Sequence, residues 1–307
     1  MKGNAAIDCN DDGALYLEAK AHFELSQVLS NPDINQLQQF LPFSPYTISP
    51  NIEEQVIVGV QATFFDCGSI GIGSSNLKTP FLKASELFQP KDINFQMPSG
   101  VISREKLLTK RFRFDGESLA RLRAMFGSAT PTRIEAVTAL IWKSAMEAAR
   151  KRPDWNKTCP PSSAVTRVHC GTLVEPNEKV ELQDFAGILR KSIRAIDSEY
   201  LSALQGKNGL AKACKSLMAA RKLAAASAGE IELYRFSSWA RFPFYEVDFG
   251  WGRPGWVCTT SVPMKNVVIL MGTRCGDGIE AWITLAEHDM IEFERDDEFL
   301  QFITPSP

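Results

Sequence analysis

Alternating apolar and polar side chains mark the first element that the sequence predicts. From residue 15 to residue 23, leucine, alanine and phenylalanine occupy every second position, with tyrosine, glutamate, lysine and histidine between them. Because successive side chains of a strand point to opposite faces, this period of two predicts a strand with one buried face. A β-branched and aromatic run over residues 55–65 predicts a buried central strand, and residues 69–73 predict a short strand after it.

Helical periodicity begins after a further predicted strand over residues 108–114. Asp115 suits the N-cap of the next helix, and Thr132 with Glu135 has the spacing of a capping box that opens a second one. Apolar residues at helical spacing predict a third helix over residues 182–200, and an alanine-rich helix follows over residues 210–225. The predicted buried stripes contain Leu119, Leu122, Met125 and Phe126; Ile134, Val137, Ile141, Ala145 and Ala148; and, in the third helix, Leu182, Phe185, Ile188, Leu189, Ile193, Ile196 and Tyr200.

The last third of the chain predicts a β-hairpin and a closing helix. Two β-branched runs over residues 267–274 and 279–285 flank a short glycine-bearing segment, which is typical of a hairpin. Residues 287–302 predict the helix. Because strands and helices mix without strict β-α-β alternation, we expect an α/β or α+β fold with two layers.

Domain organisation follows from length and from one stretch without periodicity. The 307 residues exceed the usual size of a single core, so we expect two domains. Residues 74–103 lose periodicity and contain three prolines, which is typical of a connecting segment. We assign residues 1–76 to an N-terminal domain, residues 77–104 to a connecting loop and residues 105–307 to a C-terminal domain.

Composition and charge narrow the class of protein. Hydrophobic residues make up 44% of the chain and charged residues 23%, as in soluble globular proteins, and the formal net charge is −2. Without a basic excess we expect no nucleic-acid partner, and without a long apolar stretch or a secretory leader we expect no membrane partner and a cytoplasmic location. Seven scattered cysteines without C-x-x-C spacing predict reduced, mostly buried thiols, and three widely spaced histidines predict no metal site.

The pentapeptide Asp248-Phe249-Gly250-Trp251-Gly252, called the DFGWG motif below, carries the strongest local signal. Its two glycines predict special backbone dihedral angles or close backbone approach, and the aspartate needs hydrogen bonds or a charge partner if it is buried. The aromatic residues in and around the motif suit either a substrate-binding box or core packing, and we expect core packing. These residues are Phe242, Phe244, Phe249, Trp251 and Trp256.

The DFGWG motif resembles the signature of the plant BAHD acyl-CoA-dependent acyltransferases. Four further segments resemble the same family and occur in its order: residues 64–73, 132–143, 237–239 and 276–282. The resemblance implies two chloramphenicol-acetyltransferase-like domains, with residues 77–104 as the crossover loop between them. It also implies acyl-CoA as co-substrate, no bound cofactor, a monomer, and a small-molecule alcohol such as an alkaloid as acceptor.

The family's catalytic motif is absent from the place where the resemblance predicts it. In the family, a His-x-x-x-Asp motif supplies the general base, because imidazole has a suitable pKa for taking the proton of an alcohol. It should follow Gly73 directly, but Ser74 follows instead. None of the three histidines has an aspartate four residues later, so we assign no catalytic residue. We interpret His22 as a polar residue on a strand face, His169 as a loop residue and His288 as a helix-terminus residue.

Two more departures from the family affect the prediction. The chain begins at what resembles the second or third strand of the family's first domain, so we expect a truncated N-terminal domain. The arginine-bearing stretch whose arginine pairs with the motif aspartate in the family is shortened here, and Arg167 is the possible partner of Asp248. We therefore expect acyl transfer to be absent or very weak. The alternative is a non-catalytic remnant that binds coenzyme A or a partner and modulates a full-length paralogue. A third possibility is that the N-terminal domain does not fold stably.

The glycines Gly68, Gly71 and Gly73 do not suit a nucleotide-binding loop. Their spacing is neither G-x-G-x-x-G nor that of a P-loop, and no Gly-Lys-Ser/Thr sequence follows. We expect them to serve a tight passage of a strand instead.

Overall fold

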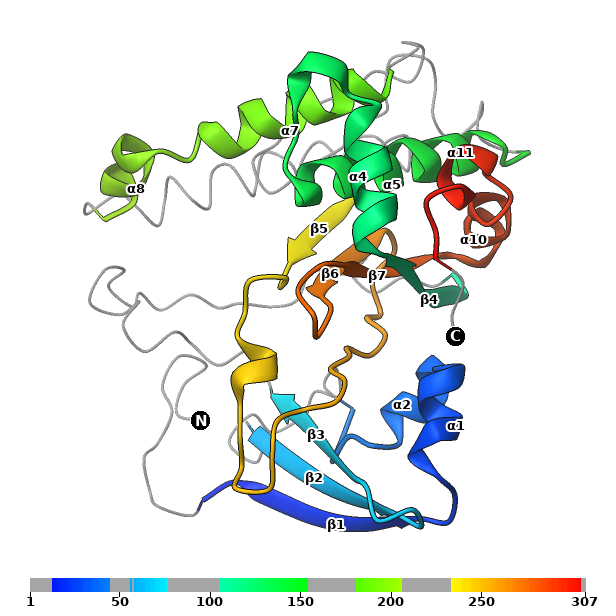
Figure 1. The fold of residues 1–307 in the computed structure, drawn as a ribbon, viewed down its shortest axis with the longest axis vertical. Helices are drawn as coiled ribbons and strands as arrows, with labels where there is room; N and C mark the ends of the chain where they lie inside the picture. Colours follow the sequence, from blue (N-terminus) through cyan, green and yellow to red (C-terminus); the bar gives the residue numbers. More distant parts are fainter. Residues whose placement is uncertain are drawn as a thin grey trace. The chain divides into compact units, whose positions relative to one another are not determined.

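The computed structural model describes residues 13–44, 56, 58–76, 105–153, 181–205 and 233–304. The chain divides into two compact units, unit 1 with residues 1–101 and 306–307, and unit 2 with residues 102–305. Figure 1 shows the helices and strands of both units. The predicted connecting loop, residues 77–104, lies outside the described residues, so the predicted domain boundaries stay a prediction.

Unit 1 contains a three-stranded sheet and two short helices. The elements are β1 (Leu15–Ala21), α1 (Leu25–Ser30), α2 (Ile34–Gln38), β2 (Val58–Phe65) and β3 (Ile70–Asn76). The strand order is β1-β2-β3, with β1 parallel and β3 antiparallel to β2. The prediction of a central strand in this region is therefore confirmed, and β3 extends three residues beyond the predicted end at residue 73.

One face of the unit 1 sheet is closely packed. The Phe65 ring contacts the rings of Phe23 and Phe40 edge-on, with centroids 5.7 and 5.5 Å away. A Cβ atom added to Gly73 would lie only 1.8 Å from the carbonyl oxygen of Phe40, so a side chain at this position requires the backbone to move. The prediction of a tight strand passage is confirmed at Gly73.

The predicted buried face of β1 is wrong. Leu15 and Leu17 are each 38% exposed, and in β1 only Ala21 is buried. β1 lies at the edge of a three-stranded sheet, where less of a strand is covered by other elements. The period of two predicts which way the side chains point, but it does not predict how many of them are buried.

Unit 2 is built on a four-stranded sheet with the order β4-β7-β6-β5. Neighbouring strands are antiparallel except β5 and β6, which are parallel, and β6 with β7 forms the predicted hairpin. The strands are β4 (Leu107–Phe114), β5 (Arg235–Ser238), β6 (Val267–Gly272) and β7 (Ile279–Ala286). The described helices are α4 (Gly116–Ala124), η2 (Gly127–Ala129), α5 (Arg133–Arg150), α7 (Leu182–Arg194), α8 (Ser198–Gln205), η3 (Phe244–Glu246), α10 (Glu287–Phe293) and α11 (Asp297–Leu300).

Both predicted helix starts are confirmed. The carboxylate of Asp115 accepts a hydrogen bond from the Ser118 amide at 2.8 Å and caps α4. At the start of α5, the Glu135 amide donates to the Thr132 hydroxyl at 3.2 Å, while the Thr132 amide donates to the Glu135 carboxylate at 2.7 Å. These bonds satisfy amides that have no partner inside a helix.

Helices and strands of unit 2 share one apolar core. Trp142 of α5 packs edge-on against Phe185 of α7, with ring centroids 4.8 Å apart. The buried Tyr234 hydroxyl, next to β5, donates to the Ala145 carbonyl of α5 at 3.1 Å. Figure 1 shows α4, α5 and α7 together beside this sheet, which agrees with the shared core.

Two predicted long helices are in fact pairs of shorter ones. The helix predicted over residues 182–200 ends after Arg194, and Asp197 caps α8 by accepting a hydrogen bond from the Tyr200 amide at 2.8 Å. Asp296 likewise caps α11 by accepting from the amides of Glu298 and Phe299, which divides the predicted helix over residues 287–302. An aspartate that bonds to nearby amides competes with a continuous helix. Three apolar residues of the predicted stripes are exposed: Met125, Ile193 and Ile196.

Several predictions concern residues outside the described ranges. They include the alanine-rich helix over residues 210–225, His169 and four of the cysteines, Cys9, Cys159, Cys170 and Cys214. In the part of the chain that the structure describes, no helix has the length and apolar character to cross a membrane. The same residues contain no group of three or more His, Cys, Asp or Glu side chains suited to hold a metal ion.

Candidate functional site

The position predicted for the catalytic motif is occupied by strand β3. Gly73, Ser74 and Ser75 pair with residues 61, 60 and 59 of β2, so the strand continues past the predicted break point without interruption. The buried Ser75 hydroxyl donates to the Phe43 carbonyl at 2.7 Å. No imidazole lies in this segment, residues 73–76.

The structure does bring one histidine close to an aspartate. His22 Nδ1 lies 3.6 Å from a carboxylate oxygen of Asp66, which belongs to the turn between β2 and β3. The two side chains are 83% and 59% exposed, so water surrounds the pair. Their separation of 44 residues carries no periodic signal, and sequence reasoning missed the pair. His22 follows the last residue of β1, so its prediction as a strand-face residue is wrong.

His288 lies in the first turn of α10, as predicted for a helix-terminus residue. Its Nδ1 atom is 3.9 Å from a carboxylate oxygen of the neighbouring Asp289. The Asp289 side chain is only 2% exposed and contacts Arg152, with an N···O distance of 2.9 Å. The carboxylate is therefore already engaged with a guanidinium group.

The DFGWG motif forms a tight loop held by its own aspartate. One carboxylate oxygen of Asp248 accepts hydrogen bonds from the Gly250 amide at 2.8 Å and from the Gly252 amide at 3.0 Å. Gly250 and Gly252 have φ angles of 101° and 115°, which only glycine adopts without strain. The two hydrogen bonds lower the pKa of Asp248, because they favour the charged carboxylate. The predicted need for special backbone angles is confirmed.

Three of the five aromatic residues predicted to pack in a core are exposed instead, and Phe244 and Trp256 are half-buried. Phe242, Phe249 and Trp251 are 55%, 57% and 64% exposed. Phe249 and Trp251 instead stack on each other, with ring centroids 5.8 Å apart and planes 28° from parallel. The turn that the two glycines make leaves both rings outside the core of unit 2. Arg167 lies outside the described residues, so its pairing with Asp248 stays a prediction.

A buried polar cluster contains Trp256, which follows the DFGWG motif by four residues in the sequence. Glu280 of β7 is 6% exposed and faces the guanidinium of Arg111 of β4 at 3.6 Å. The Trp256 indole donates to the Glu280 carboxylate at 3.3 Å, and the Arg111 guanidinium lies 5.5 Å from the centre of the Trp256 ring. Burial raises the pKa of Glu280, and the nearby Arg111 opposes this effect.

Two further titratable groups belong to the same cluster. Burial, and secondarily the charge of Glu280, raises the pKa of the Cys258 thiol to about 12. Burial also raises the pKa of Tyr245, whose hydroxyl oxygen accepts a hydrogen bond from the Val257 amide at 3.2 Å. Cys258 is therefore a neutral thiol at neutral pH and a poor nucleophile. Because Cys67 and Cys275 are exposed, the prediction of mostly buried thiols is wrong for two of the three cysteines described.

None of the titratable groups of the polar cluster and the DFGWG loop described above is available as a general base or a nucleophile. The acid of the buried cluster is paired with arginine, its thiol is protonated, and the DFGWG aspartate bonds to its own loop. All three arrangements stabilise structure. His22 is the described imidazole nearest to a carboxylate in unit 1, but it stands in open solvent.

Comparison with known proteins places this chain among plant acyltransferases. The Transferase family matches residues 1–79 and 162–300. Stemmadenine O-acetyltransferase of Catharanthus roseus is 33% identical over 344 residues, which cover 95% of this chain and 78% of that protein. Vinorine synthase of Rauvolfia serpentina is 30% identical over 337 residues, which cover 94% of this chain and 76% of that protein.

Solved structures agree in fold. A crystal structure of vinorine synthase matches with a TM-score of 0.75 and 27% identity, over 100% of this chain and 81% of that one. The F. sporotrichioides TRI101 structure, complexed with coenzyme A and T-2, matches with a TM-score of 0.63 over 95% of this chain and 81% of that one. At 13% identity it supports the fold alone. The chain has the mixed α/β fold of these two-domain acyltransferases, and it belongs to the Transferase family, that of the plant BAHD acyltransferases.

Proposed function

We propose that this chain is a member of the acyl-CoA-dependent O-acyltransferases whose own transfer activity is absent or very weak. By family, the reaction moves an acetyl or other acyl group from coenzyme A to a hydroxyl of a plant specialised metabolite. We expect a cytoplasmic monomer without a bound cofactor, with acyl-CoA and a small-molecule alcohol as the partners of any remaining activity.

One observation carries this proposal. Strand β3 runs from Gly73 into Ser74 and Ser75 with paired backbone, at the place where the resemblance predicts the base. An alcohol is a weak nucleophile at neutral pH, and a positioned general base contributes on the order of 10²–10⁴-fold to such a reaction. We expect a loss of at least this size relative to an intact family member.

The comparisons support an internal loss of sequence. The match to stemmadenine O-acetyltransferase extends over 344 residues, although this chain has only 307. The relative must therefore carry segments that have no counterpart in this chain.

The test is turnover by the purified full chain. Release of coenzyme A from acetyl-CoA is measured with a panel of alkaloid and limonoid alcohols, beside stemmadenine O-acetyltransferase as the active reference. A rate comparable with the reference would refute the proposal. His22→Ala is the control variant: we expect it to leave any residual rate unchanged, because the exposed imidazole lies outside a water-excluding site.

A rescue experiment sharpens the test. A segment with the family's His-x-x-x-Asp motif is inserted between Gly73 and Ser74, and a second insert carries alanine in place of the histidine. Recovery of transfer with the first insert alone supports the missing base as the cause. Equal rates for both inserts would contradict it.

The alternative function is binding of coenzyme A or a partner without transfer. It is favoured by the packed core of unit 2 and by the DFGWG loop, whose two aspartate hydrogen bonds are intact. Calorimetric titration of the full chain with coenzyme A separates the two cases. Saturable binding without turnover supports the alternative, and the absence of a binding heat contradicts its coenzyme A form.

A further inference from the structure

The chain between β5 and β6 leaves the sheet of unit 2 and later returns to it (Figure 1). Residues 246–255 lie in this stretch, contain the DFGWG motif and are called the flap below. All of them are exposed except Pro254, which is half-buried. In the part of the chain that the structure describes, one hydrogen bond joins the flap to other residues, from the Glu246 amide to the Pro243 carbonyl at 3.0 Å. The flap is therefore held in place through the residues at its two ends.

The tip of the flap, residues 248–252, is stabilised by its own contacts. The Asp248 carboxylate accepts hydrogen bonds from the Gly250 and Gly252 amides at 2.8 and 3.0 Å. The rings of Phe249 and Trp251 stack with their centroids 5.8 Å apart. Because these contacts are internal to the tip, the tip can keep its shape when the flap changes its position.

One hydrogen bond closes the base of the flap. Tyr245 precedes the flap, and its hydroxyl oxygen accepts a hydrogen bond from the Val257 amide at 3.2 Å. Both residues are half-buried. Since this bond joins the two ends of the flap, the flap can tilt as one piece about its base.

Trp256 attaches this base to the sheet. Its indole N–H lies 3.3 and 3.4 Å from the two carboxylate oxygens of Glu280 in β7. The Trp256 ring also lies 6.1 Å from the ring of Trp282 in β7 and 5.5 Å from the guanidinium of Arg111 in β4. Both distances to the carboxylate exceed the usual range of an N–H···O bond, so this attachment is weaker than a short hydrogen bond.

The charge of Glu280 also favours release of Trp256. The residue is only 6% exposed, and burial raises its pKa, although Arg111, the Trp256 indole and Arg113 oppose this effect. In its charged form the carboxylate therefore gains hydration when the indole moves away. This gain offsets part of the hydrogen bond that is lost.

We propose that the flap is a hinged strap, whose tip moves as one body when the Trp256 indole releases the Glu280 carboxylate. The exposed rings of Phe249 and Trp251 move with the tip. This conformational device does not depend on acyl transfer and needs no catalytic histidine.

The test is amide hydrogen exchange of the full chain, followed by NMR at Val257 in the base and at Gly250 and Gly252 in the tip. Trp256→Phe keeps an aromatic ring and removes the N–H donor. We expect the Val257 amide to exchange about 10- to 100-fold faster, the usual effect of losing a hydrogen bond to a charged group, with both tip amides unchanged. Asp248→Ala should do the reverse, with faster exchange at Gly250 and Gly252 and no change at Val257.

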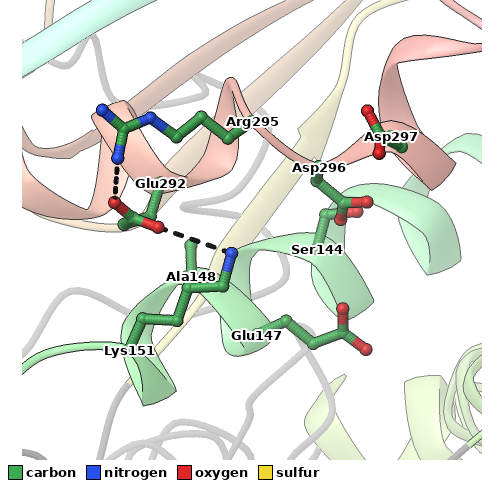
Figure 2. Close-up of a pocket in the computed structure, with 8 residues that line it drawn as sticks. All are labelled: Ser144, Glu147, Ala148, Lys151, Glu292, Arg295, Asp296 and Asp297. Carbon is green, nitrogen blue, oxygen red and sulfur yellow. Dashed lines mark hydrogen bonds and ion pairs between the residues drawn. The ribbon is translucent and has the colours of Figure 1, made fainter.

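Two control variants should leave all three amides unchanged. Trp239→Phe also removes an indole N–H, which donates to the Ser237 hydroxyl at 3.0 Å instead of to Glu280. Lys151→Ala breaks a contact between other elements of unit 2, because Lys151 Nζ lies 3.4 Å from a carboxylate oxygen of Glu292 in α10. Figure 2 shows this pair at the edge of a cavity of about 190 Å³. Urea unfolding shows that unit 2 is folded in each variant before exchange is compared.

Tyr245→Phe is a second variant, for the case in which Trp256→Phe does not fold. It removes the acceptor of the Val257 amide, so Val257 should exchange faster while Gly250 and Gly252 do not change. Two results would overturn the proposal. One is unchanged exchange at Val257 in folded Trp256→Phe. The other is faster exchange of tip and base amides together in either base variant, because the flap would then open only by unfolding.

Discussion

Replacing Gly73 by alanine tests the packing of β3 against the segment after α2. The added Cβ would lie 1.8 Å from the Phe40 carbonyl oxygen and 2.8 Å from the carbonyl carbon. Both are backbone atoms, so no side-chain rotation relieves the clash. Overpacking of this kind costs about 1–3 kcal/mol. The amide protection of β2 and β3 should then fall by about 5- to 150-fold, if these amides exchange through opening of the sheet.

Gly187→Ala is the matched control, with the opposite expected sign. Gly187 lies on the exposed side of α7, and an added Cβ meets no atom within 4 Å. Alanine is favoured over glycine in a helix interior by about 1 kcal/mol, so this variant should stabilise unit 2.

Two different measurements distinguish the effects of the two variants. All six tryptophans of the chain follow residue 102 and so belong to unit 2, whose unfolding in urea their fluorescence reports. Hydrogen exchange of peptides covering residues 58–76 reports unit 1. We expect Gly73→Ala to speed hydrogen exchange in residues 58–76 without changing the urea midpoint of the fluorescence transition. Gly187→Ala should raise that urea midpoint. Unchanged exchange in Gly73→Ala would refute the close approach of Gly73 to Phe40.

Four further predictions concern single side chains. Thr132→Ala removes the hydroxyl of the capping box and should cost about 1 kcal/mol in urea unfolding, while Thr132→Ser should cost little. Asp248→Ala leaves the Gly250 amide without its acceptor, so this amide should exchange faster while the fluorescence transition stays in place. Cys258 has a folded pKa of about 12 against an ordinary 9.0, so the unfolded thiol ionises first and stability falls as the pH rises from about 9 to 12. Cys258→Ala should remove this part of the slope. Iodoacetamide at pH 8 should label Cys67 before Cys258, as mass spectrometry of the peptides would show.

Local signals in the sequence predicted local structure well. The N-cap of α4 and the capping box of α5 each depend on residues three positions apart, and the β6–β7 hairpin turns between Gly272 and Ile279; all are confirmed. The breaks before α8 and α11 were missed for a local reason as well. Asp197 and Asp296 were placed inside continuous apolar stripes, although aspartate favours caps over helix interiors.

Non-local features escaped the sequence because no short pattern encodes them. His22 and Asp66 meet only because parallel pairing of β1 with β2 aligns the ends of the two strands. The exposure of Phe249 and Trp251 depends on the direction in which Gly250 and Gly252 turn the chain, and hydrophobicity alone wrongly predicted burial. The same limit applies to β1, whose apolar period was clear but whose edge position was not.

The first strand of unit 2 completes its contacts only with the last residues of the unit. β4 pairs with β7 over its full length, and the Thr304 amide donates to the Arg113 carbonyl of β4 at 2.8 Å. Phe112 of β4 also packs edge-on against Phe293 and Phe299. During synthesis, β4 therefore emerges from the ribosome with an unpaired edge, and its partner residues in β7 follow 165 to 179 positions later. Until β7 has been synthesised, the edge of β4 is open to pairing with strands of other chains.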